Sequence, residues 1–228
     1  MRWRSRTIRS SRHTLDSVRV LLRSVGELAI TGGVVMLLFC AYLLWGTGAY
    51  TARMQLVLQQ QLAEDRQDDP AKPDDGKLNK IKLGGAVAML RIPRLGNDYK
   101  YAVVEGVDTE NLKQGPGHKP GSAMPGKVGN FVVSGHRTTY GAPFNRINEL
   151  KRDDEIIVDT RRARYIYRVT SQDIVDPGDL DVTAPVPGKP DIRPIRAYIT
   201  LTTCHPEYSA AQRLIVYGVL KKTEPREE

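Results

Sequence analysis

The chain reads Thr-Leu-Thr-Thr-Cys-His-Pro over residues 200–206, and after Arg213 it continues Leu-Ile-Val-Tyr over residues 214–217. β-Branched and aromatic residues favour extended backbone, so both stretches predict strands. The sequence has two cysteines, and only Cys204 lies outside a long apolar segment near the N-terminus. A lone thiol close to histidine and arginine residues suggests covalent acyl chemistry.

Further strand-like segments precede this stretch, separated by turn residues. Together the predicted strands are 86–92, 99–104, 130–134, 155–160, 165–175, 196–203 and 214–220. Helical signals are brief, at 108–113 and 143–150. Prolines at 116, 120 and 125, and again from 185 to 194, mark two long loops where strands are disfavoured. Many short strands with few helices predict an all-β barrel or sandwich.

Length and charge narrow the class of protein. A chain of 228 residues suits one folded domain with an appendage. The formal net charge is +8. The first 50 residues contain seven arginines and only two acidic residues, Asp16 and Glu27, so they carry a net charge of +5 and the rest of the chain carries only +3. A nucleic-acid-binding domain would carry a basic stripe of its own. The distribution of charge therefore argues against nucleic acid as a partner.

The uncharged segment Leu28–Gly48 follows the basic block. As a helix it would span about 31 Å, which matches a hydrocarbon core of about 30 Å. We predict a single transmembrane helix over 28–50, after a basic cytoplasmic tail over 1–27. The positive-inside rule places the N-terminus in the cytoplasm and the rest of the chain outside the cell membrane. The alternative is a cleaved signal peptide, which the small residues at 46–49 favour and the length of the apolar stretch disfavours.

The remainder of the chain divides by composition. Residues 51–80 are rich in Gln, Asp, Lys and Pro and predict an extracellular linker, although 51–64 contains good helix formers. The strand-rich part, 81–222, is the predicted folded domain. Residues 223–228 form a charged C-terminal tail.

Four histidines are available as partners for the thiol. His13 lies in the basic block, where arginines already orient the membrane segment. His205 adjoins Cys204, and neighbouring side chains of a strand point to opposite faces. His136 follows a predicted strand at its transition to a loop, which is a common place for active-site residues. His136 is therefore the first candidate, and His118, in a loop of prolines and glycines, is the second.

The thiol also needs an activating group. A free cysteine, with a pKa of about 8.5, is mostly protonated at neutral pH. Cys40 lies inside the predicted membrane span, so Cys204 is a reactive thiol, half of an intermolecular disulfide, or a buried inert residue. Arg213 could stabilise the thiolate or a developing oxyanion. The structural alternative for Arg213 is a salt bridge at the end of a strand.

These residues, in this order, resemble the sortases, extracellular cysteine transpeptidases of Gram-positive bacteria, over about residues 81–222. The signature of that family is a strand ending in Thr-Leu-x-Thr-Cys, an arginine opening the next strand, and a histidine after an earlier strand. The matching positions are 200–204, Arg213 and His136. The context over 129–141 is similar to that of the class E sortases of actinobacteria.

The resemblance implies a closed eight-stranded β-barrel with short helices, preceded by one transmembrane helix. It implies that Cys204 attacks the Thr–Gly bond of a sorting signal on a secreted surface protein and forms a thioacyl intermediate. An amine of a peptidoglycan precursor then releases the acyl group. His136 would act as general acid and base, and Arg213 would stabilise the oxyanion or position the substrate.

Substrate preference also follows from the resemblance. Class E members typically prefer a Leu-Ala-x-Thr-Gly signal over the commoner Leu-Pro-x-Thr-Gly signal. Thr203 and Tyr140 flank the catalytic residues and are candidate substrate contacts, with packing roles as the equal alternative.

We predict no cofactor and no metal. The loop 176–181 holds three aspartates, but turn formation near Pro-Gly accounts for them, and the loop lacks the glycine and terminal glutamate of an EF-hand.

Three other functions compete with this reading. An L,D-transpeptidase would carry a Ser-x-Gly-Cys context, whereas Thr202 and Thr203 precede this cysteine. A catalytically silent membrane-tethered barrel would bury Cys204 as a small apolar residue, and the retained histidine and arginine argue against it. A pilus-polymerising sortase often carries a lid ahead of the barrel, and residues 51–80 show no aromatic lid motif.

Overall fold

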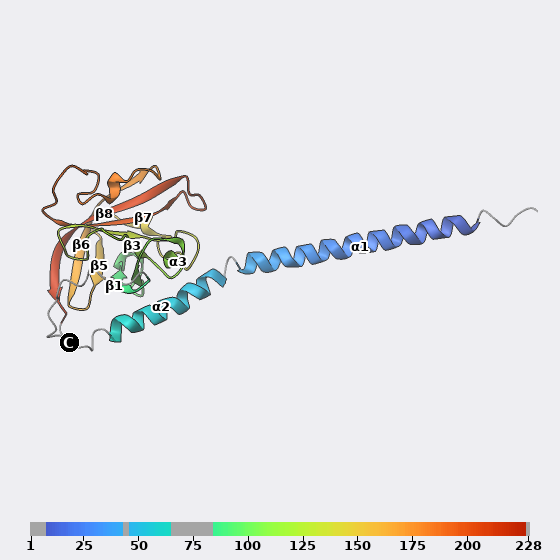
Figure 1. Cartoon of the computed structure of the whole chain (residues 1–228), viewed down its shortest axis with the longest axis horizontal. Helices are drawn as coiled ribbons and strands as arrows, with labels where there is room; N and C mark the ends of the chain where they lie inside the picture. The colour runs from blue at the N-terminus through green and yellow to red at the C-terminus, as the bar shows by residue number, and fades with distance from the viewer. Residues whose placement is uncertain (1–7, 43–45, 65–83, 227–228) are drawn as a thin grey trace, which may run out of the picture. The chain divides into compact units, whose positions relative to one another are not determined.

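The computed structural model describes residues 8–42, 46–64 and 84–226, and the side chains from residue 18 onward within them. The chain forms two compact units, residues 1–46 and 47–228. Each unit is described by itself (Figure 1).

Eight strands of the second unit close into a barrel in the order β1-β2-β3-β4-β7-β8-β6-β5. The strands are β1 (Ala86–Arg91), β2 (Lys100–Glu105), β3 (Gly117–His118), β4 (Gly129–Ser134), β5 (Glu155–Asp159), β6 (Ala163–Val175), β7 (Ala197–His205) and β8 (Gln212–Pro225). The short helices of this part are α3 (Thr109–Leu112), η3 (Pro93–Leu95), η4 (Ile147–Glu149) and η5 (Asp181–Thr183). The predicted closed eight-stranded barrel is confirmed.

β3 was not predicted, because its two residues lie among the prolines and glycines of a loop. It pairs parallel with β2 and antiparallel with β4, and so completes the wall of the barrel. β8 extends to Pro225, where it pairs with Ala163 of β6, so the last strand enters the segment predicted as a tail.

Alternation along β4 and β7 separates the core of the barrel from its outer face. Phe131, Val133, Ile199 and Leu201 are fully buried and belong to the main hydrophobic core. The residues between them therefore point outward. β4 pairs parallel with β7 in register from Gly129 opposite Ala197 to Ser134 opposite Thr202, so these two strands present one continuous outer face.

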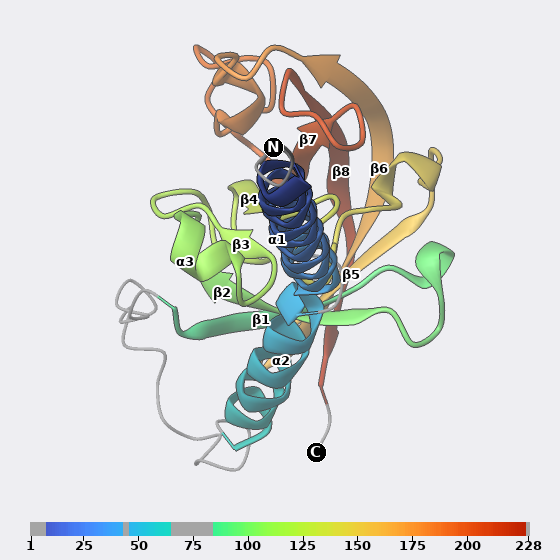
Figure 2. The same cartoon turned by 90° about the vertical axis from the view of Figure 1, so that its right-hand side faces the viewer.

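A long helix, α2 (Thr47–Glu64), packs on β1 and β2 (Figure 2). Leu58 is buried against Ala102 and Val104. Gln55 is 5% exposed, and its Nε2 donates to the carbonyls of Ala102 (3.0 Å) and Gln114 (2.8 Å) while its Oε1 accepts from the Ala102 N–H (2.7 Å). We anticipated a helix over 51–64 but not its packing against the barrel. Residues 65–80 of the predicted linker lie outside the described residues.

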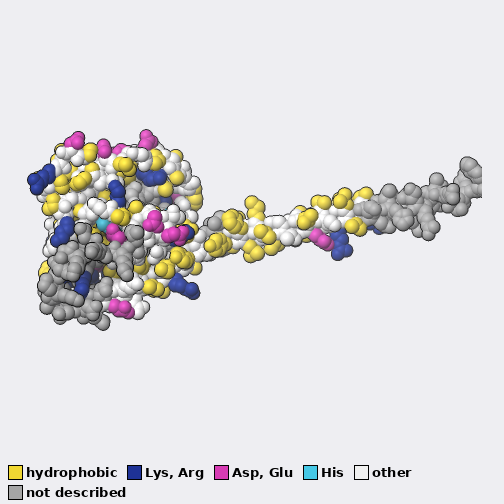
Figure 3. Space-filling view, in the orientation of Figure 1, with side chains coloured by type: hydrophobic (Ala, Val, Ile, Leu, Met, Phe, Trp, Pro, Cys, Tyr) yellow, Lys and Arg dark blue, Asp and Glu magenta, His cyan; other side chains and the backbone are white. Residues whose placement is uncertain are grey.

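The first unit contains α1 (Ile8–Ala41), whose section Val18–Ala41 has a mean hydropathy of 1.8 and is long and apolar enough to cross a membrane. Hydrophobic side chains lie along its described length, with charged ones gathered toward one end (Figure 3). An apolar N-terminal helix is thus confirmed. Its apolar section begins ten residues before the predicted start at Leu28, because the residues from Val18 onward are mostly apolar apart from Arg19 and the exposed pair Arg23 and Glu27, which lie 2.8 Å apart. It ends at Ala41, whereas the predicted helix continued to residue 50, and residues from Thr47 onward belong to α2.

The buried amide of Gln55 should contribute strongly to the docking of α2. We expect Gln55→Ala to lower the free energy of unfolding by about 2 kcal/mol, since it leaves the Ala102 and Gln114 backbone groups without partners. Thermal unfolding followed by circular dichroism measures this. Gln61→Ala, on the exposed side of the same helix, is the matched control, and equal melting of the two variants would contradict the prediction.

Candidate active site

Cys204 and Arg213 lie directly opposite each other, near the end of β7 and the start of β8. Side chains of directly paired residues in antiparallel strands project to the same face with Cβ atoms about 5 Å apart. Cys204 is half-buried, as is Arg213. The pairing therefore brings a thiol and a guanidinium to one place on the outside of the barrel.

His136 reaches the same place from β4. The parallel ladder ends with Ser134 opposite Thr202, and the Gly135 N–H donates to the Thr202 carbonyl at 3.1 Å. His136 lies in the loop after β4, and the residues on either side of it bond to the end of β7: the Thr203 hydroxyl donates to the Gly135 carbonyl at 2.8 Å, and Arg137 Nη1 lies 3.4 Å from the Cys204 carbonyl. The loop that carries His136 is therefore held beside the part of β7 that carries Cys204, and the catalytic roles of His136, Cys204 and Arg213 stay a prediction.

The environment of His136 favours a neutral imidazole. Its ring lies 5.0 Å from the ring of Tyr140, measured between centroids, and its Nε2 is buried with no hydrogen-bond partner among the described residues. Burial lowers the pKa of His136 below its ordinary value. A neutral ring with a free nitrogen is ready to accept a proton from a nearby group.

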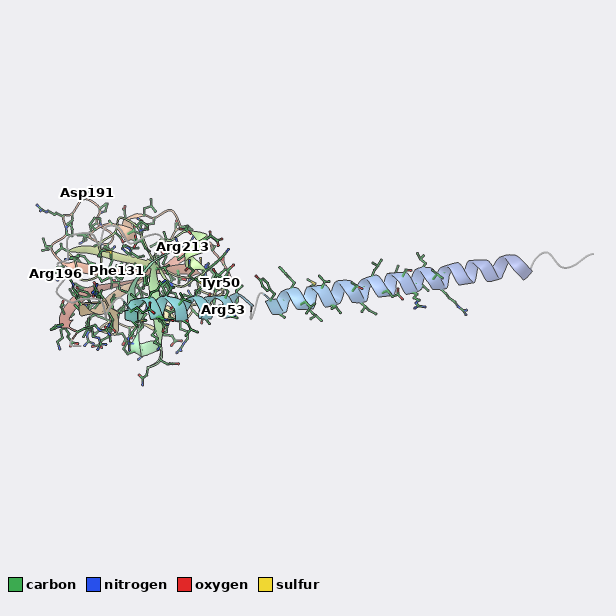
Figure 4. The ribbon with its side chains drawn as sticks, turned by 60° about the horizontal axis from the view of Figure 1, so that its bottom comes forward. Tyr50, Arg53, Phe131, Asp191, Arg196 and Arg213 are labelled. Atoms are coloured by element: carbon green, nitrogen blue, oxygen red, sulfur yellow. The ribbon has the colours of Figure 1, made fainter. Side chains whose placement is uncertain are left out.

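Arg213 is held by backbone carbonyls. Its Nη1 donates to the carbonyls of Ala210 (3.0 Å) and Gln212 (2.9 Å) in the turn between β7 and β8. Among the described residues no carboxylate forms an ion pair with it. In this part of the chain, therefore, no acidic side chain forms the strand-end salt bridge that was the structural alternative for Arg213. Arg196 directly precedes β7, whereas Arg213 pairs with Cys204 near the other end of this strand, and Figure 4 labels the two arginines well apart.

Comparison with known proteins agrees with this geometry. The model of the sortase domain matches residues 90–221, which is more than half of the chain. The chain belongs to the sortase family. Members of this family are cysteine transpeptidases.

The relatives found include class E sortases. Sortase SrtE1 of Streptomyces coelicolor is 38% identical over 91% of this chain, which spans only 59% of the length of that relative. Sortase SrtE2 of the same organism is 29% identical over 95% of this chain and 87% of its own length. The solved sortase E of Streptomyces avermitilis is 40% identical, with a TM-score of 0.58 over 63% of this chain and 93% of that one. The SrtF sortase of Corynebacterium diphtheriae has a TM-score of 0.64 at 31% identity, over 70% of this chain and 93% of that one.

The two residues predicted as substrate contacts occupy different environments. Thr203 is 3% exposed and donates its hydroxyl to the Gly135 carbonyl at 2.8 Å, so it joins β7 to the backbone that precedes His136. Tyr140 is half-buried beside His136, in a left-handed backbone conformation with φ 51°. Tyr140 is therefore accessible at the rim of the site, whereas Thr203 faces inward.

His118, the second candidate partner, has another role in this sortase. It is 2% exposed and lies between Glu105, 2.6 Å from its Nδ1, and Ser122, 2.8 Å from its Nε2. Its ring stacks on Phe131 of the core at 5.1 Å. Both ring nitrogens and one ring face are occupied, so His118 supports the barrel wall.

Arg137 is a site residue that the sequence analysis did not single out. It is 7% exposed, and its Nη1 lies 3.4 Å from the Cys204 carbonyl and 3.3 Å from Nδ1 of His205. Arginine is usually exposed, so the sequence alone gave no reason to place it here.

The described residues contain no group of three or more His, Cys, Asp or Glu side chains that could hold a metal ion. In the loop that was weighed as a calcium site, a carboxylate oxygen of Asp179 accepts from the Asp181 N–H at 3.2 Å. That contact is the turn-forming role that was expected for these aspartates.

The state of His136 is open to direct measurement. We expect its imidazole to titrate below the ordinary value of about 6.5, because burial disfavours the charged ring. Since its folded-state pKa is lowered, His136 should reduce stability as the pH falls below about 6.5, where the unfolded chain binds the proton first. Histidine-selective NMR measures the titration. Tyr140→Ala should raise the midpoint by admitting water, and Tyr208→Ala, at an 87% exposed side chain, is the control. A wild-type midpoint at or above 6.5 would contradict this account.

Proposed function

We propose that this protein is a membrane-anchored cysteine transpeptidase that cleaves a C-terminal sorting signal between Thr and Gly. The acyl product is transferred to an amine of a peptidoglycan precursor. One observation supports the proposal: Cys204 pairs with Arg213 across β7 and β8, and the residues on either side of His136 bond to the end of β7 that carries Cys204. Membership of the sortase family supports the reaction class.

In the first step the Cys204 thiolate attacks the carbonyl carbon of the threonine in the signal. The carbonyl oxygen becomes an oxyanion, which the guanidinium of Arg213 stabilises from the neighbouring strand. His136, having taken the thiol proton, gives it to the nitrogen of the departing glycine. The C–N bond breaks, and a thioester joins the threonine to Cys204.

In the second step an amine attacks the thioester. His136 is neutral again after the glycine leaves, and since burial lowers its pKa the ring stays unprotonated and its nitrogen is free to accept the proton of the attacking amine. The tetrahedral intermediate collapses, an amide bond forms, and Cys204 is released. The same oxyanion contact from Arg213 serves both steps.

Ser134 and Thr202 are half-buried next to the catalytic residues and can contact an extended signal. Beyond them the outer face of β4 and β7 is covered, because Asn130, Val132 and Thr200 are at most 2% exposed and Asn130 and Thr200 bond to the segment around Val182. We assign Tyr140 to the substrate contacts, since it stands at the rim beside His136. For Thr203 we favour the structural role, because its hydroxyl is already used by the Gly135 carbonyl.

We place the chain in the cell membrane as a single-pass protein, with the N-terminus in the cytoplasm and the barrel outside. The apolar section of α1 supports an anchor, and the arginines before it support the orientation. In this location the site would meet secreted proteins that bear a sorting signal, together with peptidoglycan precursors.

Peptide cleavage tests the reaction. The full chain in detergent micelles should cleave Leu-Ala-x-Thr-Gly and Leu-Pro-x-Thr-Gly peptides between Thr and Gly when an amine is supplied, with the alanine peptide preferred. Mass spectrometry should detect a thioester on Cys204, and Cys204→Ala should abolish both cleavage and adduct. Cleavage that persists in Cys204→Ala, or no cleavage of either peptide, would refute the proposal.

Single substitutions of His136 and Arg213 test the role of each residue in the reaction. We expect His136→Ala to lower kcat by about 10²–10⁴-fold through loss of proton transfer. Arg213→Ala should lower kcat by about 10²–10³-fold through loss of the oxyanion contact. Arg196→Ala is the matched control, because this exposed arginine lies at the other end of β7 from Cys204 (Figure 4). An Arg213→Ala enzyme with the activity of the control would show that the oxyanion is stabilised elsewhere.

A further inference from the structure

Arg137 carries a buried charge that the proposed chemistry does not use. Its side chain is 7% exposed, and among the described residues no carboxylate forms an ion pair with its guanidinium. Burying an ion without a counter-ion costs free energy, so a buried arginine of this kind needs hydrogen bonds that offset the cost. The hydrogen bonds of Arg137 indicate its role.

The guanidinium of Arg137 bonds to the end of β7 and to the loop after β4, two segments that are no longer paired as strands at this point. Nη1 reaches the Cys204 carbonyl at 3.4 Å and Nδ1 of His205 at 3.3 Å, and Nη2 donates to Oδ1 of Asn148 at 3.2 Å. The backbone carbonyl of Arg137 itself accepts from the side chain of Asn145 at 2.9 Å. Both ends of this arginine are thus fixed.

The parallel ladder between β4 and β7 stops before the catalytic residues. Its last links are the Gly135 N–H to the Thr202 carbonyl and the Thr203 hydroxyl to the Gly135 carbonyl. Beyond these links, within the described residues, the side chain of Arg137 makes the next hydrogen bond between the two chain segments, and its acceptor is the carbonyl of Cys204 itself. The residue before Arg137 is His136.

We propose that Arg137 is a positioning residue that holds the end of β7 against the loop after β4, so that Cys204 and His136 keep one spacing. This inference rests on the proposed function only for its effect on turnover. The planar guanidinium has several donors in a fixed arrangement, so it can bond both segments at once.

Several other titratable groups surround the thiol and enter any pH profile. They are His136, Tyr140, His205, Glu207 and Arg213. Glu207 is the acidic member and is bonded to the side chain of Asn145 at 2.8 Å. These groups stay constant when Arg137 alone is changed, so a difference between variants reports on Arg137.

The test uses the full chain in detergent micelles with Cys40→Ala, which leaves Cys204 as the only thiol. Arg137→Gln removes the charge, and Arg137→Lys keeps the charge but loses the fork. Arg146→Gln is the matched control, because Arg146 is an exposed arginine of the same loop that pairs with Glu149. Two quantities are measured for each variant: the rate of iodoacetamide alkylation of Cys204 against pH, and kcat and KM with the signal peptide.

We expect Arg137→Gln to slow the alkylation of Cys204 about threefold or more across the pH range and to lower kcat about tenfold or more, with KM changed less than about threefold, because His136 is then held less well beside the thiol. Arg137→Lys, which lacks the planar fork, should show losses in both quantities. Arg146→Gln should match the wild type in both. An Arg137→Gln enzyme with the wild-type curve and kcat would overturn the proposal.

Two further outcomes distinguish a folding defect, or a failure of the proposed function, from a failure of the role proposed for Arg137. If Arg137→Gln fails to fold by circular dichroism, the folded Arg137→Lys protein decides, since a wild-type kcat there would overturn the positioning role and a reduced one would support it. If the wild type cleaves no signal peptide, the proposed function fails, and the alkylation curves still test the effect of Arg137 on Cys204.

Discussion

The parallel pairing of β4 with β7 is the constraint on which the rest of this structure depends. The two strands are about seventy residues apart in sequence, yet their register runs without a shift from Gly129 opposite Ala197 to Ser134 opposite Thr202. A slip by one residue would turn every outward side chain inward. The buried residues of both strands oppose such a slip, so the packing of the core also fixes which part of β7 faces the loop that begins after Ser134.

The electrostatic balance of the site follows from the same arrangement. Arg213 and Arg137 approach Cys204 from β8 and from the loop after β4, and each is bonded to neutral groups instead of carboxylates among the described residues. Burial lowers the pKa of His136. In the proposed reaction, the charge that develops on a substrate oxygen would meet a guanidinium whose orientation is already fixed by backbone carbonyls, which is the condition for effective electrostatic catalysis.

Sequence patterns predicted most of the barrel but little of what supports it. The long strands were visible because β-branched residues run through them, and His136, Cys204 and Arg213 were visible because each stands at a strand end. β3 was too short to show a pattern. The docking of α2 was hidden because its buried positions, Thr47, Thr51, Gln55 and Leu58, form a helical face that is mostly polar. Arg137 was hidden because only the fold shows that it is buried.

The contacts made by the polar face of α2 extend the folded unit of this sortase toward the N-terminus. The family model begins at residue 90, whereas the compact unit begins at Thr47. Thr51 donates to the Lys113 carbonyl at 2.7 Å, and its methyl group lies where a side chain at Gly141 would stand, in the loop that carries Tyr140. The hydroxyl of Tyr101, on β2, donates to the Gly141 carbonyl at 3.2 Å. The loop beside His136 is therefore held from α2 and β2 together, so the helix that follows the apolar segment belongs to the support of the site.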